Sequence, residues 1–206
     1  MPEVTALFWD VGGVLLTNGW DRASRREAVR TFGLDREEFG DRHDLASPAF
    51  ETGRLTLDEY LTRTVFHRSR PFTMEEFTAF MFAQSRPNAE PLALVERLAR
   101  SGRYLLATLN NESLPLNLYR IEQFGLRQYF SVFFSSCFLG VRKPEEAIYR
   151  LALQLTQRAP EECLFIDDRA LNLECARQCG MQTIHYRDPA QLRDALRHAG
   201  VHIDDA

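Results

Sequence analysis

The stretch Val4-Thr-Ala-Leu-Phe-Trp-Asp-Val-Gly-Gly13 decides the fold. Residues 4–9 are a short apolar run with the length of one buried strand. Asp10 stands directly at the end of this run, and Gly12 and Gly13 predict a turn. The opening of the chain therefore predicts a buried strand that presents a carboxylate at its end.

Strands and helices are expected to alternate in the second half of the chain. Gly102, Gly125 and Gly180 stop three of the helical segments. This alternation predicts an α/β fold, a Rossmann-like three-layer core in which helices cover both faces of a parallel sheet. The expected strands are 103–108, 130–135, 163–166 and 182–186, and the expected helices are 91–101, 113–124, 145–157, 169–179 and 189–199.

A block of helices is expected between the first strand and this alternating region. Apolar spacing and N-cap residues predict helices over 21–32, 35–42, 56–67 and 73–84. We therefore expect two parts: residues 1–17 and 87–206 form the α/β core, and residues 18–86 form a helical cap. Six phenylalanines either fill the cap core or cover a cap-to-cap homodimer surface, which leaves the oligomeric state open: Phe50, Phe66, Phe72, Phe77, Phe80 and Phe82.

Composition excludes several classes of protein. The chain has 206 residues, 45% of them hydrophobic, and a formal net charge of −4, which argues against a general nucleic-acid surface. No apolar run has the length of a membrane span, and the acidic start does not resemble a secretory signal. The four cysteines form no C-x-x-C pair. Free thiols without an export signal predict a cytoplasmic protein. From the charge and the lack of an apolar span, we expect no nucleic-acid or membrane partners.

Polar groups follow four of the expected strands. Because ligands bind beyond the carboxyl ends of parallel strands, these groups should meet at one edge of the sheet. Each alone has an ordinary explanation, such as a turn or helix cap. Together, three carboxylates and a lysine favour Mg²⁺-assisted phosphoryl transfer, with an aspartate as nucleophile. The groups are Asp10, Thr108, Asn110, Asn111, Arg142, Lys143, Asp167 and Asp168, and Lys143 is the only lysine of the chain.

Four segments carry a family resemblance. Phe8–Leu16, Leu106–Asn110, Gly140–Tyr149 and Leu164–Asn172 resemble, in order, the four motifs of the haloacid dehalogenase superfamily of hydrolases. The similarity is to the branch with a helical cap inserted after the first strand. It implies a Mg²⁺-dependent phosphohydrolase that acts on a small phosphorylated metabolite, such as a sugar phosphate, through an aspartyl-phosphate.

The resemblance also implies roles for single residues. Asp10 would be the nucleophile and a metal ligand, and Lys143 would neutralise Asp10 and the phosphate. The other metal ligands would be the carbonyl of Gly12, Asp168 directly, and Asp167 directly or through water. Thr108 and the backbone of Leu109 and Asn110 would hold the phosphoryl group, and Asn172 would brace the acidic cluster or lie in solvent.

Gly12 departs from the family pattern, because phosphatases of this family usually carry a second aspartate there as general acid and base. General acid catalysis contributes about 10²–10⁴-fold in rate. Two alternatives stay open: a metal-independent 2-haloacid dehalogenase, whose halide leaving group needs no acid, and a catalytically weak member that binds a ligand or protein. A nicotinamide-binding protein is excluded, since no G-x-G-x-x-G follows the first strand.

Substrate choice is expected to depend on the cap, which also excludes water during chemistry. Trp20 and His43 are our main candidates for substrate contact, and His43 is also a candidate for the missing proton donor. The other cap candidates are Asp44, Glu51 and Arg54.

Overall fold

The computed structural model describes residues 2–203 and contains a five-stranded sheet in which every pairing is parallel. The strand order is β3-β2-β1-β4-β5, so β1 lies at the centre of the sheet. The prediction of an α/β fold with a parallel sheet is confirmed. The strands are β1 (Ala6–Trp9), β2 (Leu105–Asn110), β3 (Val132–Ser135), β4 (Cys163–Asp167) and β5 (Gln182–His185).

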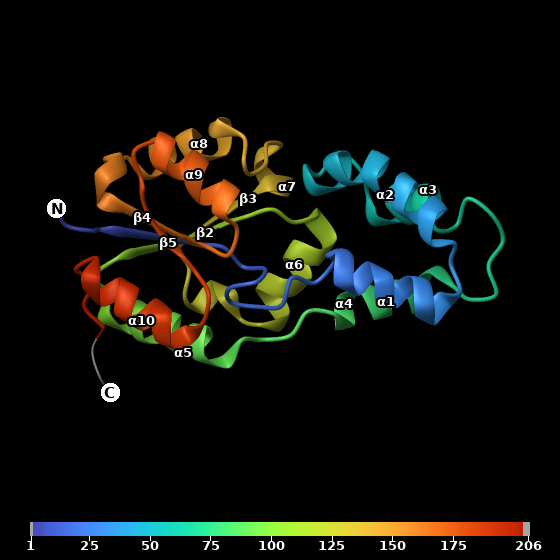
Figure 1. The fold of residues 1–206 in the computed structure, drawn as a ribbon, viewed down its shortest axis with the longest axis horizontal. Helices are drawn as coiled ribbons and strands as arrows, with labels where there is room; N and C mark the ends of the chain where they lie inside the picture. Colours follow the sequence, from blue (N-terminus) through green and yellow to red (C-terminus); the bar gives the residue numbers. More distant parts are fainter. Residues whose placement is uncertain (1, 204–206) are drawn as a thin grey trace.

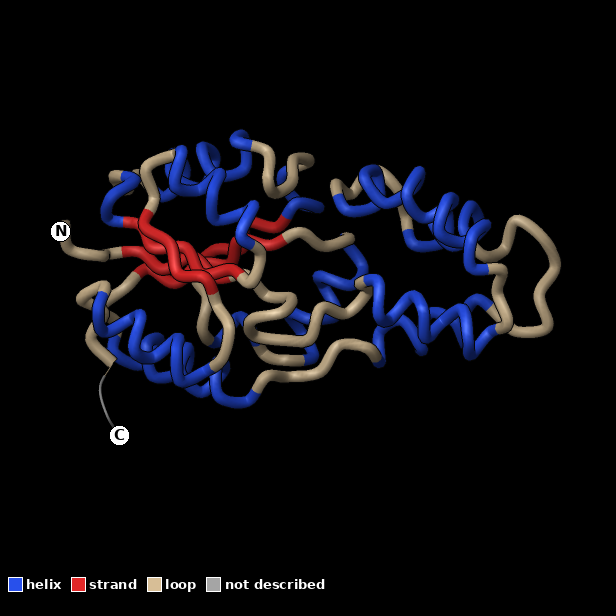
Figure 2. Tube along the Cα trace, viewed as in Figure 1, coloured by secondary structure: helices blue, strands red, loops and turns tan. Residues whose placement is uncertain are grey.

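Helices cover both faces of the sheet (Figures 1 and 2). Leu7 and Trp9 of β1 point into a core shared with α5 (Ala89–Ser101) and α10 (Pro189–His198). Ala6 and Phe8 point the other way, into a core shared with α8 (Glu146–Thr156) and α9 (Ala170–Gln178). Because successive strand residues alternate between faces, a fully apolar β1 fits its place between two helical layers.

Four helices form a lobe beyond the carboxyl ends of the strands (Figure 1). They are α1 (Arg22–Phe32), α2 (Arg36–Glu51), α3 (Leu57–Thr64) and α4 (Met74–Ala83). This lobe has its own apolar core, in which Phe50 and Phe77 are buried and the other four cap phenylalanines pack around them. Leu116 of α6 (Leu114–Gln123) belongs to the same cluster, so the lobe also packs on the sheet domain. The division of the chain at residues 18 and 86 stays a prediction.

Two predicted boundaries are wrong in ways that affect the site. Strand β2 continues to Asn110, not Thr108, because its last four residues pair with β3. Helix α2 continues to Glu51 instead of ending near residue 42. Pro48 removes only one late hydrogen bond. The ring of Phe50 stacks on Tyr60 with centroids 4.1 Å apart, which holds the last turn in place.

A short helix that the sequence did not reveal, α7 (Ser136–Leu139), follows β3 and contacts α2. Ser136 Oγ donates a hydrogen bond of 2.6 Å to the carbonyl of Glu51, which joins the two parts of the chain. None of the described helices combines the length and apolar character needed to cross a bilayer.

Candidate active site

Three carboxylates meet at the carboxyl ends of β1 and β4. Asp10 follows β1, Asp167 ends β4 and Asp168 follows it. The register pairs Trp9 with Ile166, and the Asp10 amide donates to the Ile166 carbonyl at 2.9 Å. This pairing places Asp10 beside Asp167. One oxygen from each of the three aspartates lies within 4.8 Å of the others, which is close enough for a single cation.

Lys143 lies between two of these carboxylates. Its Nζ is 3.1 Å from Asp10 Oδ1 and 2.5 Å from Asp167 Oδ2, and it is 3% exposed. Burial alone would lower the pKa of this ammonium, but the charges of Asp10 and Asp167 raise it above its usual value. Lys143 is therefore charged at neutral pH. Burial, together with the neighbouring aspartates and against the pull of Lys143, raises the pKa of Asp10 to about 7.

The two aspartates of β4 differ in their partners. Asp167 accepts hydrogen bonds from the amide of Arg169, from Asn172 Nδ2 and from Lys143. Asp168 Oδ1 is buried and has no hydrogen-bond partner among the described residues. Burial and the charge of Asp167 raise the pKa of Asp168. An unpaired buried oxygen beside two other carboxylates is unfavourable unless a cation is bound, so this donor set fits a hard divalent metal.

The contacts of the Asp10 carboxylate are made by one of its two oxygens. Oδ1 accepts from the Val11 amide at 2.8 Å as well as from Lys143. Both of these contacts are made by Oδ1 and not by Oδ2, and Asp10 lines the cavity above the sheet. The chain thus offers an aspartate oxygen that is free to attack or to bind a metal.

Thr108, Leu109 and Asn110 do not line this cavity. All three lie within β2 and are at most 1% exposed. Asn110 Nδ2 donates a hydrogen bond of 3.1 Å to Asn117 Oδ1, and Asn110 Oδ1 accepts one of 2.9 Å from Ser135 Oγ. These bonds give the Asn110 side chain a structural role. Because β2 runs two residues further than expected, Asn111, Glu112 and Ser113 reach the cavity instead. Our prediction that the strand ends at Thr108 was therefore wrong, because β2 ends at Asn110.

Gly12 and Gly13 leave room for neighbouring polar side chains. Gly13 has φ +83°, and a Cβ there would lie 2.3 Å from Asp168 Oδ2. A Cβ on Gly12, which lines the cavity, would lie 3.5 Å from Nη1 of Arg120. This arginine is 2% exposed and pairs with Glu112 at 2.9 Å. A buried ion pair therefore lies close to Gly12, the position at which the motif resemblance would imply a second aspartate.

The cavity has a volume of about 620 Å³ and is lined from both parts of the chain. Of the cap candidates, Trp20, His43 and Glu51 line it, whereas Asp44 and Arg54 do not. Arg54 instead donates to the carbonyl of Gly140 across the two parts.

Trp20 and His43 are joined through Tyr60. Trp20 Nε1 donates to the Tyr60 hydroxyl at 2.8 Å, and His43 Nδ1 lies 2.8 Å from the same oxygen. Burial, reinforced by the charge of Arg25, lowers the pKa of His43 to about 4. His43 is therefore neutral at pH 7, which disfavours it as the missing proton donor.

Four arginines of the cavity wall were not expected from the sequence, whereas Arg142 was. Arg120 and Arg169 belong to the core, and Arg22 and Arg25 belong to α1 of the cap. Nothing in the sequence distinguishes them from the other arginines of the chain, because their importance comes from tertiary placement.

Comparisons with known proteins agree with this geometry. The profile described as haloacid dehalogenase-like hydrolase matches residues 4–180. The chain is 39% identical over 139 residues to bifunctional epoxide hydrolase 2 of Rattus norvegicus, which covers 66% of this chain and 25% of that protein. It is 25% identical over 198 residues to D-ribitol-5-phosphate phosphatase of Bacteroides thetaiotaomicron, which covers 92% of this chain and 95% of that one. The chain thus spans a quarter of the first relative's length.

A solved structure shares the whole architecture. A HAD family enzyme from Bacteroides thetaiotaomicron superposes with a TM-score of 0.77 at 22% identity, covering 90% of this chain and 94% of that one. The same enzyme has been solved with magnesium and inorganic phosphate. Since the family profile spans most of the residues that carry the sheet and its acidic edge, the chain belongs to the haloacid dehalogenase-like hydrolases.

Proposed function

We propose that this hydrolase is a Mg²⁺-dependent phosphatase that acts on a small phosphorylated metabolite, through an aspartyl-phosphate on Asp10. One observation carries the proposal. Lys143 Nζ pairs with Asp10 Oδ1, Asp10 lines the cavity, and the buried Asp168 Oδ1 has no hydrogen-bond partner among the described residues. A lysine, a free nucleophilic oxygen and an unpaired ligand oxygen are what phosphoryl transfer to an aspartate needs.

The reaction has two displacements at phosphorus. Asp10 Oδ2 attacks the phosphorus, the bond to the leaving alcohol oxygen breaks, and Lys143 offsets the charge on the phosphoryl oxygens. A water molecule then attacks the phosphorus of the aspartyl-phosphate, which releases inorganic phosphate and restores Asp10. Asn172 and the Arg169 amide keep Asp167 oriented toward Lys143 throughout.

Asp10, Asp167, Asp168 and the Gly12 carbonyl would hold the cation. Magnesium would supply positive charge that allows carboxylates and phosphate to approach each other. The relative that was solved with magnesium and inorganic phosphate supports this choice of metal. We include Asp167 as a ligand directly or through water, because its oxygens already have protein partners.

The leaving alcohol takes its proton from solvent in this proposal. Gly12 has no side chain, and His43 is neutral. Substrates whose leaving group is a weak base should therefore react fastest. Trp20 and His43 are proposed to contact the substrate, because both line the cavity. The free cysteines fit a reducing compartment, and we propose a cytoplasmic location.

The test is phosphate release from a panel of small phosphomonoesters, with Mg²⁺ and with EDTA. Asp10→Asn serves as the blank, after circular dichroism has shown that it is folded. We expect metal-dependent release that disappears in the variant. Release that persists in Asp10→Asn would contradict the proposal. Absence of release together with chloride release from 2-chloropropionate would favour the dehalogenase alternative, and absence of both would favour a binding role.

A further inference from the structure

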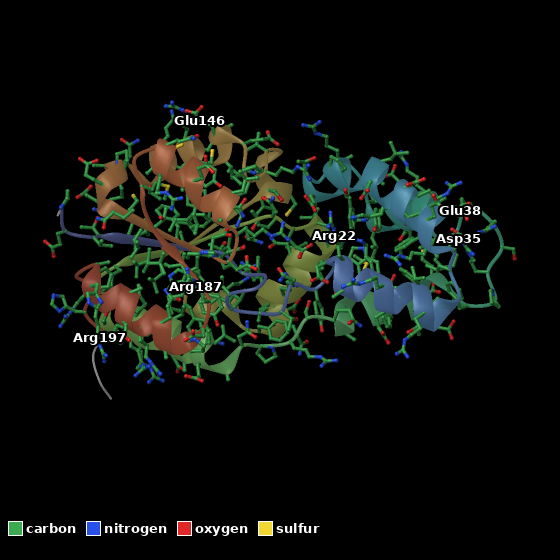
Figure 3. All side chains as sticks on the ribbon, in the orientation of Figure 1. Arg22, Asp35, Glu38, Glu146, Arg187 and Arg197 are labelled. Carbon is green, nitrogen blue, oxygen red and sulfur yellow. The ribbon has the colours of Figure 1, made fainter. Side chains whose placement is uncertain are left out.

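We propose that the substrate carries a second anionic group, a carboxylate or a second phosphate, and that Arg22 and Arg25 of the cap bind it. The inference rests on the proposed phosphatase function and narrows its substrate class. The two arginines lie three positions apart on α1, and both line the cavity that contains Asp10 and Lys143. Figure 3 shows Arg22 at the end of α1 that faces the core.

Neither guanidinium pairs with a carboxylate in the described part of the chain. Arg25 Nη1 donates to the carbonyl of Trp20 at 2.6 Å, which uses one of its five N–H donors. The Arg22 guanidinium makes no hydrogen bond or ion pair within residues 2–203. Arg142 and Arg120 differ, because Arg142 pairs with Glu51 at 2.7 Å and Arg120 pairs with Glu112 at 2.9 Å.

The two cap arginines also disfavour each other. Burial is the main cause that lowers the pKa of Arg25. Tyr60, Asp21 and Asp44 oppose it, and the charge of Arg22 adds a smaller contribution in the same direction as burial. Arg22 is exposed and Arg25 is half-buried, so both guanidinium groups have donors that a ligand in the cavity can use. A carboxylate or phosphate matches the fork of a guanidinium in shape and charge.

Uncharged side chains also line the cavity. They are those of Trp20, His43 and Phe50, beside the acidic Asp21, Glu51 and Glu112. His43 Nδ1 is occupied by Tyr60, so Nε2 is the ring atom that remains for a ligand. Such a wall suits a short uncharged or hydroxylated segment. A cavity of about 620 Å³ therefore fits a compact metabolite with an acidic group at each end.

Paired substrates test this inference. Phosphoglycerate is compared with glycerol phosphate, and fructose bisphosphate with fructose monophosphate, with kcat and KM measured for each. We expect the doubly anionic member of at least one pair to have the higher kcat/KM, through a lower KM. Equal kcat/KM within both pairs would overturn the inference and leave the phosphatase function intact. No hydrolysis of any phosphomonoester would overturn the phosphatase function and this inference with it.

Variants assign the effect to the two arginines. Arg22→Ala and Arg25→Ala should each lower the ratio of kcat/KM between the doubly and singly anionic members about 10- to 100-fold, the loss of one or two charge-assisted hydrogen bonds. Arg22→Ala is the cleaner variant, because Arg25 also holds the Trp20 backbone. Arg26→Ala, which removes the same charge from an exposed position outside the cavity, is the matched control. An unchanged ratio in both cavity variants would overturn the assignment.

Discussion

Asn111 and Lys143 are joined by two hydrogen bonds of 2.8 Å: Asn111 Nδ2 donates to the Lys143 carbonyl, and the Lys143 amide donates to Asn111 Oδ1. The amide therefore fixes the backbone of the loop that carries the lysine. Lys143 Nζ in turn lies between Asp10 and Asp167. The position of the Lys143 ammonium group thus depends on a residue 32 positions earlier in the chain.

Asn111→Ala should lower kcat about 10- to 100-fold. The substitution removes both bonds to the loop, and small displacements of a catalytic group have effects of this size. Steady-state phosphate release at saturating Mg²⁺ measures the kcat of the variant and of the wild type. Gln154→Ala, at an exposed position on α8, is the control for loss of an amide. A wild-type kcat in Asn111→Ala would show that the loop holds Lys143 without this clamp.

Asp168→Asn should stabilise the metal-free protein by about 1 kcal/mol while lowering activity at least about 100-fold. The variant removes one of three adjacent carboxylates whose oxygen lacks a partner. Urea unfolding in EDTA measures the gain in stability. Repeating it with Mg²⁺ should stabilise the wild type and leave the variant unchanged.

Asp41→Asn removes an equal charge from an exposed site outside the acidic cluster. It should keep both the Mg²⁺ response and the activity of the wild type. If Asp168→Asn still responded to Mg²⁺ as the wild type does, Asp168 would not be a metal ligand.

His43 should make stability depend on pH between about 4 and 6.5. Its pKa falls to about 4 on folding, mainly through burial, from an ordinary value of 6.5. The unfolded chain therefore binds this proton in a range where the folded chain does not, and stability falls as the pH is lowered. The loss reaches up to about 3 kcal/mol.

The measurement is the difference in unfolding free energy between wild type and His43→Gln at several pH values in EDTA. The raised pKa of Asp10 has the opposite effect on stability, but it is present in both proteins and cancels in the difference. A difference that stays constant from pH 7 to pH 4 would mean that His43 is not held neutral.

Gly19→Ala should destabilise the fold by about 3 kcal/mol or more. A Cβ at this position would lie 1.9 Å from Nη2 of Arg120. That side chain cannot move freely, because Glu112, Ser85 Oγ and the Thr17 carbonyl hold it. Disrupting a buried ion pair typically costs about 3–5 kcal/mol.

Gly33→Ala is the matched control for this effect. Gly33 has φ +60°, close to the +63° of Gly19, but a Cβ there would meet nothing within 4 Å. Gly33→Ala should lower the unfolding free energy by only about 1 kcal/mol, the cost of a non-glycine residue at positive φ. Thermal or urea unfolding compares the two variants. Equal losses of stability in the two variants would mean that the Arg120 side chain moves aside for the added methyl group at little cost.

The sequence located the acidic edge because local patterns determine it. Short apolar runs bounded by turn residues favour buried strands, so the positions of Asp10, Asp167 and Asp168 after such runs indicated the edge. Lys143 was noticeable as the only lysine. The sequence placed the end of β2 two residues too early. Residues 105–109 are apolar or small and give no stop signal, so the end of the strand is determined by its pairing with β3.

The cavity wall could not be predicted in the same way. Arg22, Arg25 and Arg120 lie on helices whose pattern resembles any amphipathic surface. Their contacts join residues from distant parts of the chain, such as Arg120 with Ser85 and Thr17. The neutral state of His43 likewise depends on its burial within the cap.

Trapping of the phosphorylated enzyme tests the central claim most directly. Wild-type protein is mixed with radiolabelled phosphate ester and Mg²⁺, quenched in acid within milliseconds, and the protein is digested and mapped. We predict label on the peptide that contains Asp10, lost on treatment with hydroxylamine as an acyl phosphate should be, and absent from Asp10→Asn. Full turnover with no label on this peptide at any quench time, or label that persists in Asp10→Asn, would contradict the account.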